Sequence, residues 1–103
     1  MASDKDYLDF IIDQLSNLDG ISYRPMMGEY ILYFQGKVIG GIYDDRFLLK
    51  DSESARQMMP EATVDIPYEG AKPMLLVDNI EDKEFLKQLI ESCYDELPEP
   101  RKK

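Results

Sequence analysis

Residues 23–50, YRPMMGEYILYFQGKVIGGIYDDRFLLK, carry the pattern that decides the fold. Apolar runs alternate there with short turn signals. The runs are rich in Tyr, Ile, Leu, Val and Phe, which favour β-strands, and they cover residues 29–34, 37–43 and 47–50. Gln35-Gly36 and Asp44-Asp45-Arg46 separate them, and glycine and aspartate are typical of tight links between antiparallel strands. The stretch therefore predicts three strands joined by two hairpin turns.

Gly40 and Gly41 lie inside the second of these strands. A glycine has no side chain to pack, so it weakens a strand unless the position requires its small size. A glycine pair at such a place is typical of a β-bulge or of a close approach by another backbone. We expect one of these two features at Gly40-Gly41.

A helix and one more strand are predicted before this unit. The helix should end at Gly20. Strand character then starts at Ile21 and breaks between Pro25 and Gly28. The apolar face of the helix should comprise the residues that recur every three or four positions, namely Tyr7, Phe10, Ile11, Leu15 and Leu18.

The chain after residue 50 predicts a short helix, two strands and a last helix. Asp51 or Ser52 can cap the short helix, which ends before Pro60. Residues 63–66 and 74–77 have strand character. Asp78 and Glu81 form a capping box for the last helix. The apolar stripe of that helix should comprise Phe85, Leu86, Leu89, Ile90, Cys93, Tyr94 and Leu97.

These elements predict an α+β fold in the order α-β(3–4)-α-β(2)-α. An antiparallel sheet with one apolar face buries that face under helices, so we expect a two-layer sandwich with the helices on one face. The length of 103 residues suits a single domain. We expect this domain to cover residues 1–97 and a basic flexible tail to cover residues 98–103.

The charge balance limits the classes of partner. The net charge is −9, and residues 1–98 carry nine basic and twenty acidic side chains. Nucleic-acid binding requires clustered Lys or Arg facing phosphates, so we expect no direct binding to nucleic acid and none to membranes.

With a single cysteine, Cys93, the chain cannot form an internal disulfide, and we expect a cytoplasmic protein. A homodimer formed through an edge strand is a further expectation.

The sequence argues against catalysis. It contains no histidine, which excludes Ser-His-Asp and Cys-His sites and the usual neutral-pH general base. Cys93 shares a helical face with Leu89 and Ile90, so we expect it to be buried and inert. Acidic residues are abundant, but they lack the spacing of a calcium loop. We therefore expect no enzyme activity, no cofactor and no metal.

The segment Arg24 to Gly28 is the part that scaffold roles explain least. Two adjacent methionines, Met26 and Met27, cannot both point inward along an extended strand. Methionine is an adaptable side chain that serves at recognition surfaces, although it also fills irregular core space. We expect a protein partner to contact Arg24, Met26, Met27, Gly28 and Lys50. The alternative is a small-ligand pocket between sheet and helices near Tyr30, Tyr33 and Tyr68.

Arg24-x-Met26-Met27-Gly28 begins a series of residues that continues through the chain. The later members are Tyr30, Tyr33, Gly36-Lys37, Gly40, the run of residues 45–50 and Pro67-Tyr68. In this order and spacing they resemble the TfoX N-terminal domain family, the domain shared with the Sxy competence regulators. The resemblance covers nearly the whole chain and implies the same two-layer α-β(3–4)-α-β(2)-α fold. It also implies a role as a co-regulator of transcription that acts beside a separate DNA-binding factor.

This chain departs from the family pattern in two respects. Family members commonly read Met-Phe-Gly-Gly where this chain has Met26-Met27-Gly28-Glu29. Full-length competence regulators also carry a second, C-terminal domain, which we do not expect here. Because a shared fold does not by itself transfer a function, the hypothesis is a small regulatory module that binds a protein partner and has no DNA-binding activity of its own.

Overall fold

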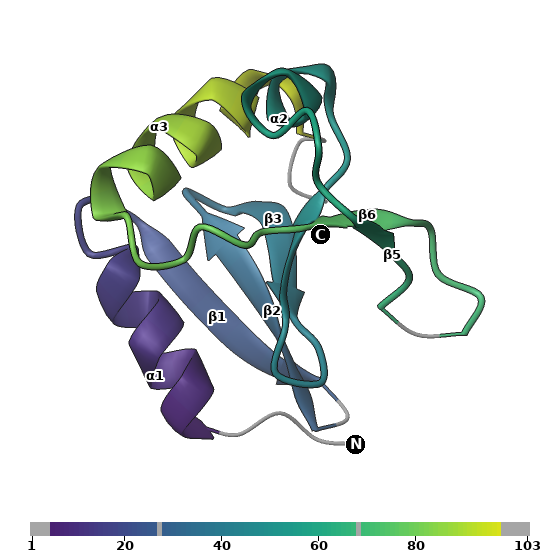
Figure 1. The fold of residues 1–103 in the computed structure, drawn as a ribbon. Coiled ribbons are helices and arrows are strands. Elements are labelled where there is room, and N and C mark those ends of the chain that lie inside the picture. The colour runs from purple at the N-terminus through teal and green to yellow at the C-terminus, as the bar shows by residue number, and fades with distance from the viewer. Residues whose placement is uncertain (1–4, 27, 68, 98–103) are drawn as a thin grey trace.

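The computed structural model describes residues 5–26, 28–67 and 69–97 (Figure 1). The strands form one sheet in the order β1-β2-β3-β4-β6-β5, and every neighbouring pair is antiparallel. This arrangement confirms the predicted α+β class. In chain order the elements are α1 (Lys5–Gln14), β1 (Ile21–Met26), β2 (Glu29–Phe34), β3 (Lys37–Ile42), β4 (Phe47–Lys50), α2 (Glu53–Met58), β5 (Val64–Asp65), β6 (Met74–Leu76), α3 (Lys83–Cys93) and the 3₁₀ helix η1 (Tyr94–Glu96).

The two predicted hairpin turns are present. Gln35 and Gly36 have φ angles of 51° and 88°, and Asp44 and Asp45 have φ angles of 53° and 57°. Two consecutive positive φ angles are the signature of the turn type that suits the twist of antiparallel strands. The turns set the register of β2 against β3 and of β3 against β4. The predicted tail at residues 98–103 lies outside the described residues.

The glycine pair combines both of the predicted features. Leu32 lies opposite Gly40 while Tyr33 lies opposite Val38, so Ile39 is the extra residue of a bulge in β3. A Cβ atom on Gly40 would lie 2.0 Å from the backbone oxygen of Leu48 on β4. The bulge and the close approach of the β4 backbone are therefore confirmed.

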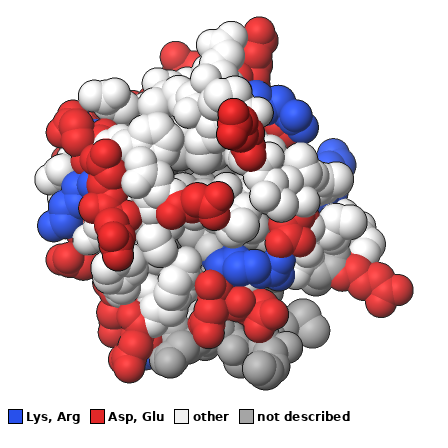
Figure 2. All heavy atoms as spheres, in the orientation of Figure 1, with Lys and Arg blue, Asp and Glu red and all other residues white. Residues whose placement is uncertain are grey.

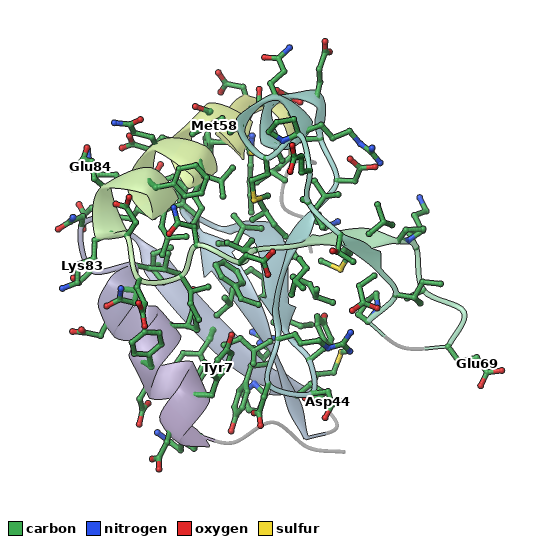
Figure 3. All side chains as sticks on the ribbon, in the orientation of Figure 1. Tyr7, Asp44, Met58, Glu69, Lys83 and Glu84 are labelled. Atoms are coloured by element: carbon green, nitrogen blue, oxygen red, sulfur yellow. The ribbon has the colours of Figure 1, made fainter. Side chains whose placement is uncertain are left out.

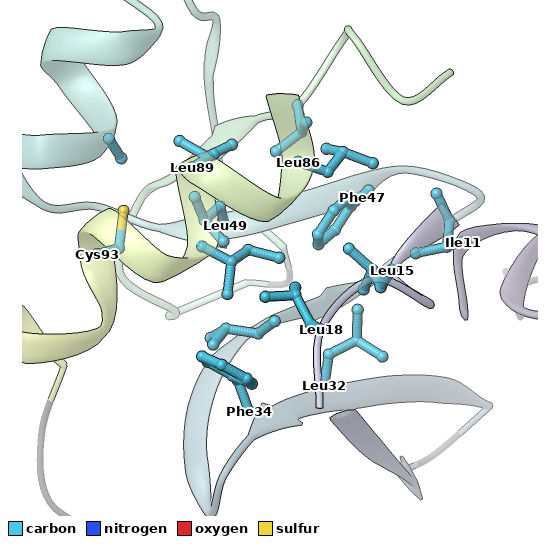
Figure 4. Packing of buried hydrophobic residues seen from close by; sticks show 14 of the residues in the cluster. Ile11, Leu15, Leu18, Leu32, Phe34, Phe47, Leu49, Leu86, Leu89 and Cys93 are labelled. Atoms are coloured by element: carbon cyan, nitrogen blue, oxygen red, sulfur yellow. The ribbon is translucent and has the colours of Figure 1, made fainter. Parts of the chain in front are cut away.

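The hydrophobic core fills the layer between the sheet and the helices (Figure 4). Both α1 and α3 lie on the same side of the sheet (Figure 1). On α1 the prediction was wrong in part, because Phe10 is 37% exposed whereas Leu8, which the predicted face omitted, is fully buried. The three- and four-residue spacing allows two neighbouring stripes on α1, and the sheet packs against the one that contains Leu8 and Ile11 and continues to Leu15 just after the helix.

The last helix begins later than predicted. Asp82, and not Asp78, is its N-cap, and its side chain accepts a hydrogen bond from the backbone N–H of Phe85 at 3.0 Å. The capping-box pattern misled the prediction because aspartates stand at both positions. The predicted stripe is otherwise correct, with Leu86, Leu89 and Ile90 fully buried. Cys93 is 1% exposed, as predicted, and burial raises the pKa of its thiol.

The short helix α2 packs against the C-terminal end of α3. Ser52 caps it by accepting a hydrogen bond from the N–H of Ala55 at 3.1 Å, in agreement with the prediction. The Ser52 hydroxyl also donates to the Sγ atom of Cys93 at 3.3 Å. These contacts place α2 and the start of η1 beside the end of β4, where the candidate site lies.

Candidate functional site

The two faces of the sheet differ in what covers them. Leu32 and Leu49 belong to the core under the helices. Since side chains alternate along a strand, their neighbours Ile31 and Lys50 point to the opposite side. We call this opposite side the open face, because α1 and α3 lie on the other one.

A pocket of about 530 Å³ lies on the open face. Its apolar floor is formed by half-buried side chains of four strands, namely Met26, Ile31, Val38 and Met74. Residues of the β5–β6 connection form one wall, and Glu96 and Leu97 close one end. We call it the open-face pocket. It brings together segments that are far apart in the sequence.

The glycine pair contributes to this pocket. Gly40 and Tyr43 both line it. Gly41 lies against the ring of Tyr43, and a Cβ atom on Gly41 would stand 2.6 Å from that ring. Because there is no side chain at Gly41, the Tyr43 ring can pack against this position, and Tyr43 is only 6% exposed. The stretch that decides the fold therefore also supplies Met26, Ile31 and Val38 of the pocket floor.

Most of the cationic side chains that the structure describes have an acidic partner. Lys5 pairs with Asp9, Arg46 with Asp65, Arg56 with Asp51, Lys83 with Asp13 and Lys87 with Glu91. Lys37 donates a hydrogen bond to the carbonyl oxygen of Tyr94. Within residues 5–26, 28–67 and 69–97, only three cationic side chains make neither a hydrogen bond nor an ion pair: Arg24, Lys50 and Lys72.

All three of these cations belong to one region. Lys50 and Lys72 line the open-face pocket. Arg24 is exposed on β1, opposite Ile31 in the register, so it points to the same face. Figure 2 shows acidic side chains scattered over the visible side of the molecule, with Lys and Arg in small separate groups among them. Against this acidic background, Arg24, Lys50 and Lys72 of the open face remain without a hydrogen bond or ion pair to the described residues.

The two acidic residues that line the pocket, Asp51 and Glu96, accept hydrogen bonds from other residues of the chain. Asp51 accepts two hydrogen bonds from the Arg56 guanidinium, at 2.6 and 2.8 Å, and these bonds lower the pKa of Asp51. The carboxylate of Glu96 accepts from the N–H of Glu53 at 2.9 Å and from the hydroxyl of Ser54. These hydrogen bonds lower the pKa of Glu96. Neither carboxylate forms an ion pair with Lys50 or Lys72.

The contact between Glu96 and α2 predicts a pH-dependent stability difference. A lowered pKa contributes stability above the pKa of the unfolded chain, and this contribution is lost as the pH falls through the folded pKa. The Glu96→Gln variant should therefore melt below the wild type near pH 7, and the gap should shrink as the pH approaches about 3. Thermal melts at both pH values measure this gap.

Glu69→Gln is the matched control for this prediction. It removes the same charge at the tip of the β5–β6 connection, where Glu69 points into solvent (Figure 3). The control should melt close to the wild type at either pH. If the gap for Glu96→Gln stayed constant with pH, the charge of Glu96 would not be the stabilising feature.

The structure places the residues predicted for partner binding as follows. Met26 and Lys50 line the open-face pocket. Arg24 lies on the same face, beyond the lining residues. Gly28 is exposed in the β1–β2 turn, with a φ angle of 87°. Met27 lies outside the described residues.

The alternative prediction placed a ligand pocket between the sheet and the helices, and that layer is filled by the core. Tyr30 packs on the core, with its ring 5.8 Å from that of Tyr23. Tyr33 points to the open face by its register but does not line the pocket there. Tyr68 lies outside the described residues. The structure therefore does not bring Tyr30 and Tyr33 together in one pocket.

Sequence reasoning missed several residues of the site. Ile31 and Val38 could have been found from strand alternation, because they share a face with Lys50. Met74 and the β5–β6 connection could not, because no local pattern indicates that β6 pairs with β4. The position of Lys72 in the pocket likewise depends on that pairing.

A second pocket, of about 430 Å³, lies beside α2 and the start of α3. Met58, Met59 and Phe85 contribute its apolar surface, and Glu61 and Asp78 are its charged lining residues. It lacks a cationic group among these lining residues.

Within the described ranges, no helix is both long enough and apolar enough to cross a membrane.

Comparisons with known proteins agree with the resemblance found in the sequence. The model of the TfoX N-terminal domain family matches residues 13–97. A protein of Spirochaeta aurantia, described as an uncharacterized 12.7 kDa protein in the trpE 5′ region, is 32% identical over 102 residues. That alignment covers 98% of this chain and 89% of the relative. No solved structure matches. The chain therefore belongs to the TfoX N-terminal domain family.

Proposed function

We propose that this protein is a regulatory interaction module that binds a protein partner through the open face. One observation carries the proposal: the unpaired Lys50 and Lys72 line the same pocket as Met26, which belongs to its apolar floor. Apolar contacts supply affinity at protein interfaces, and charged groups supply orientation and specificity. Membership of the TfoX N-terminal domain family supports a role in transcription regulation, which the family resemblance implies.

The chemistry of the chain favours binding over catalysis. The sequence has no histidine, and burial raises the pKa of the Cys93 thiol, so that thiol is a poor nucleophile. The net charge of −9 disfavours contact with the phosphates of nucleic acids. We therefore propose a cytoplasmic, non-catalytic module that takes part in regulation without binding DNA itself.

Two other roles have a specific observation in their favour. The 530 Å³ of the open-face pocket falls within the volume range of small-ligand sites. Strand β1 lies at one edge of the sheet, where a second copy of the chain could add a strand. Pro25 lacks an N–H group and lies in this edge strand, which weakens the case for a homodimer. We rank both roles behind partner binding.

Affinity capture tests the proposed function. The tagged full chain should retain a specific protein from an extract of its native cells, and Met26→Glu should lose it because an acidic side chain would replace an apolar contact in the pocket. Phe10→Glu is the matched control, since Phe10 is 37% exposed on the helix side and the change in charge is identical. Retention by Met26→Glu equal to that of the wild type would contradict the role of the open face, provided that both variants melt like the wild type.

A further inference from the structure

We propose that the open-face pocket recognises an extended, acidic segment of the partner that places an apolar side chain on the floor formed by Met26, Ile31, Val38 and Met74. This inference rests on the proposed function, and it specifies the chemistry of the partner.

The charges give the first argument. The chain has 21 acidic and 12 basic residues, and most of the described cations pair with a carboxylate. Lys50 and Lys72 nevertheless remain unpaired within the described part of the chain, while Asp51 and Glu96, the two acidic residues of the pocket lining, bind Arg56 and the start of α2. The pocket therefore keeps two ammonium groups available for an external anion. A carboxylate of the partner is the complementary group.

The floor gives the second argument. Two methionines, Met26 and Met74, stand beside the branched side chains of Ile31 and Val38. Methionine adapts its shape to different apolar groups, which suits a recognition surface. All four side chains are half-buried, so they are held by the sheet and still reach the pocket. A single apolar side chain of the partner can be covered there while its acidic neighbours meet the lysines.

The span of the cations gives the third argument, because it distinguishes a peptide from a small anion. Arg24 lies on β1 and Lys50 on β4, three strand steps apart in the sheet. Neighbouring strands are about 4.8 Å apart, so these positions are separated by roughly 15 Å. A small organic acid cannot reach both, whereas an extended chain of about five residues can. The three cations together therefore match a segment of polypeptide.

Selection from a phage-displayed library of random peptides tests the inference on the full chain. Peptides of about 12 residues are long enough, since they span about 40 Å when extended. Selected sequences should be acidic and contain Leu, Ile, Phe or Met. Nonspecific attraction would give the opposite result, because the overall electrostatic field of a protein with a net charge of −9 attracts basic peptides.

A pair of double variants assigns the peptides to the pocket. The double variant with Lys50→Gln and Lys72→Gln should bind the selected peptides with an affinity lower by about tenfold or more. Lys83→Gln with Lys87→Gln removes the same charge from α3, outside the pocket lining, and should leave their affinity unchanged. Equal weakening by both variants would overturn the inference, because the effect would then come from net charge alone.

The remaining outcomes separate this inference from the proposed function. Selected peptides without acidic residues that bind the wild type but not Met26→Glu would overturn the acidic chemistry and would leave the open face as the interaction surface. Peptides that bind Met26→Glu as well as they bind the wild type, or no selected peptides at all, would overturn both.

Discussion

Gly40→Ala should destabilise the protein by about 3 kcal/mol or more, one of the largest losses that a single added methyl group can cause. The new Cβ atom would stand 2.0 Å from the backbone oxygen of Leu48, and 2.9 Å from the Cα atom of Leu49. These are backbone atoms of β4, so they cannot move away without breaking the pairing of β3 with β4. Since Gly40 also has a φ angle of +159°, the substitution would strain the backbone as well.

Chemical or thermal unfolding measures this loss. For a chain of this size, about 3 kcal/mol corresponds to a fall in Tm of roughly 15 °C. Gly70→Ala is the matched control, because Gly70 also has a positive φ angle, +87°, but its added Cβ atom would meet nothing within 4 Å. The control should lose about 1 kcal/mol through backbone strain alone. Similar Tm values for the two variants would contradict the close approach of β4.

Removing both lysines of the open-face pocket should abolish most of the partner affinity. Lys50→Gln with Lys72→Gln leaves the apolar floor intact but removes the two cations that line it. A loss of about 1.4 kcal/mol of binding energy is tenfold in affinity, and two charge contacts of ordinary strength give this much or more. The free energy of unfolding should stay nearly unchanged, because neither lysine forms an ion pair in the described part of the chain.

Salt dependence provides a second measurement on the same variant. Added ions screen the attraction between the lysines and the partner's carboxylates, and they also screen the repulsion that the net charge of −9 exerts on an acidic partner. As the ionic strength rises, the affinity of the wild type should therefore fall relative to that of the double variant. A double variant that binds as tightly as the wild type at every salt concentration would contradict the assignment of these lysines.

The fold could be predicted to the extent that local chemistry determines it. The turns at Gln35-Gly36 and Asp44-Asp45 followed from short-range turn preferences. The close approach at Gly40-Gly41 followed from the cost of placing glycine in a strand. The start of α3, with Asp82 as its N-cap, could not be predicted from local chemistry. Several acidic residues stand near the start of this helix, and only the fold selects among them.

The site could be predicted only in part, and the reason is again physical. Met26 and Lys50 were singled out by residue type, and both line the open-face pocket. The rest of the pocket depends on the pairing of β6 with β4 across a separation of more than twenty residues, which leaves no periodic signal in the sequence. Core side chains fill the layer between the sheet and the helices, where the alternative ligand pocket was predicted. Leu8 and Ile11 of α1 are among them.

Backbone amide chemical shifts test the central claim most directly. The ¹⁵N-labelled full chain would be titrated with an acidic peptide from the selection, and the same titration would be repeated with a version whose Asp and Glu are changed to Asn and Gln. We predict the largest shifts at Ile31, Val38, Lys50, Lys72 and Met74, together with much weaker binding of the neutral peptide. Shifts concentrated on α1 and α3, or equal binding of both peptides, would contradict the assignment of the open face as a site for an acidic partner.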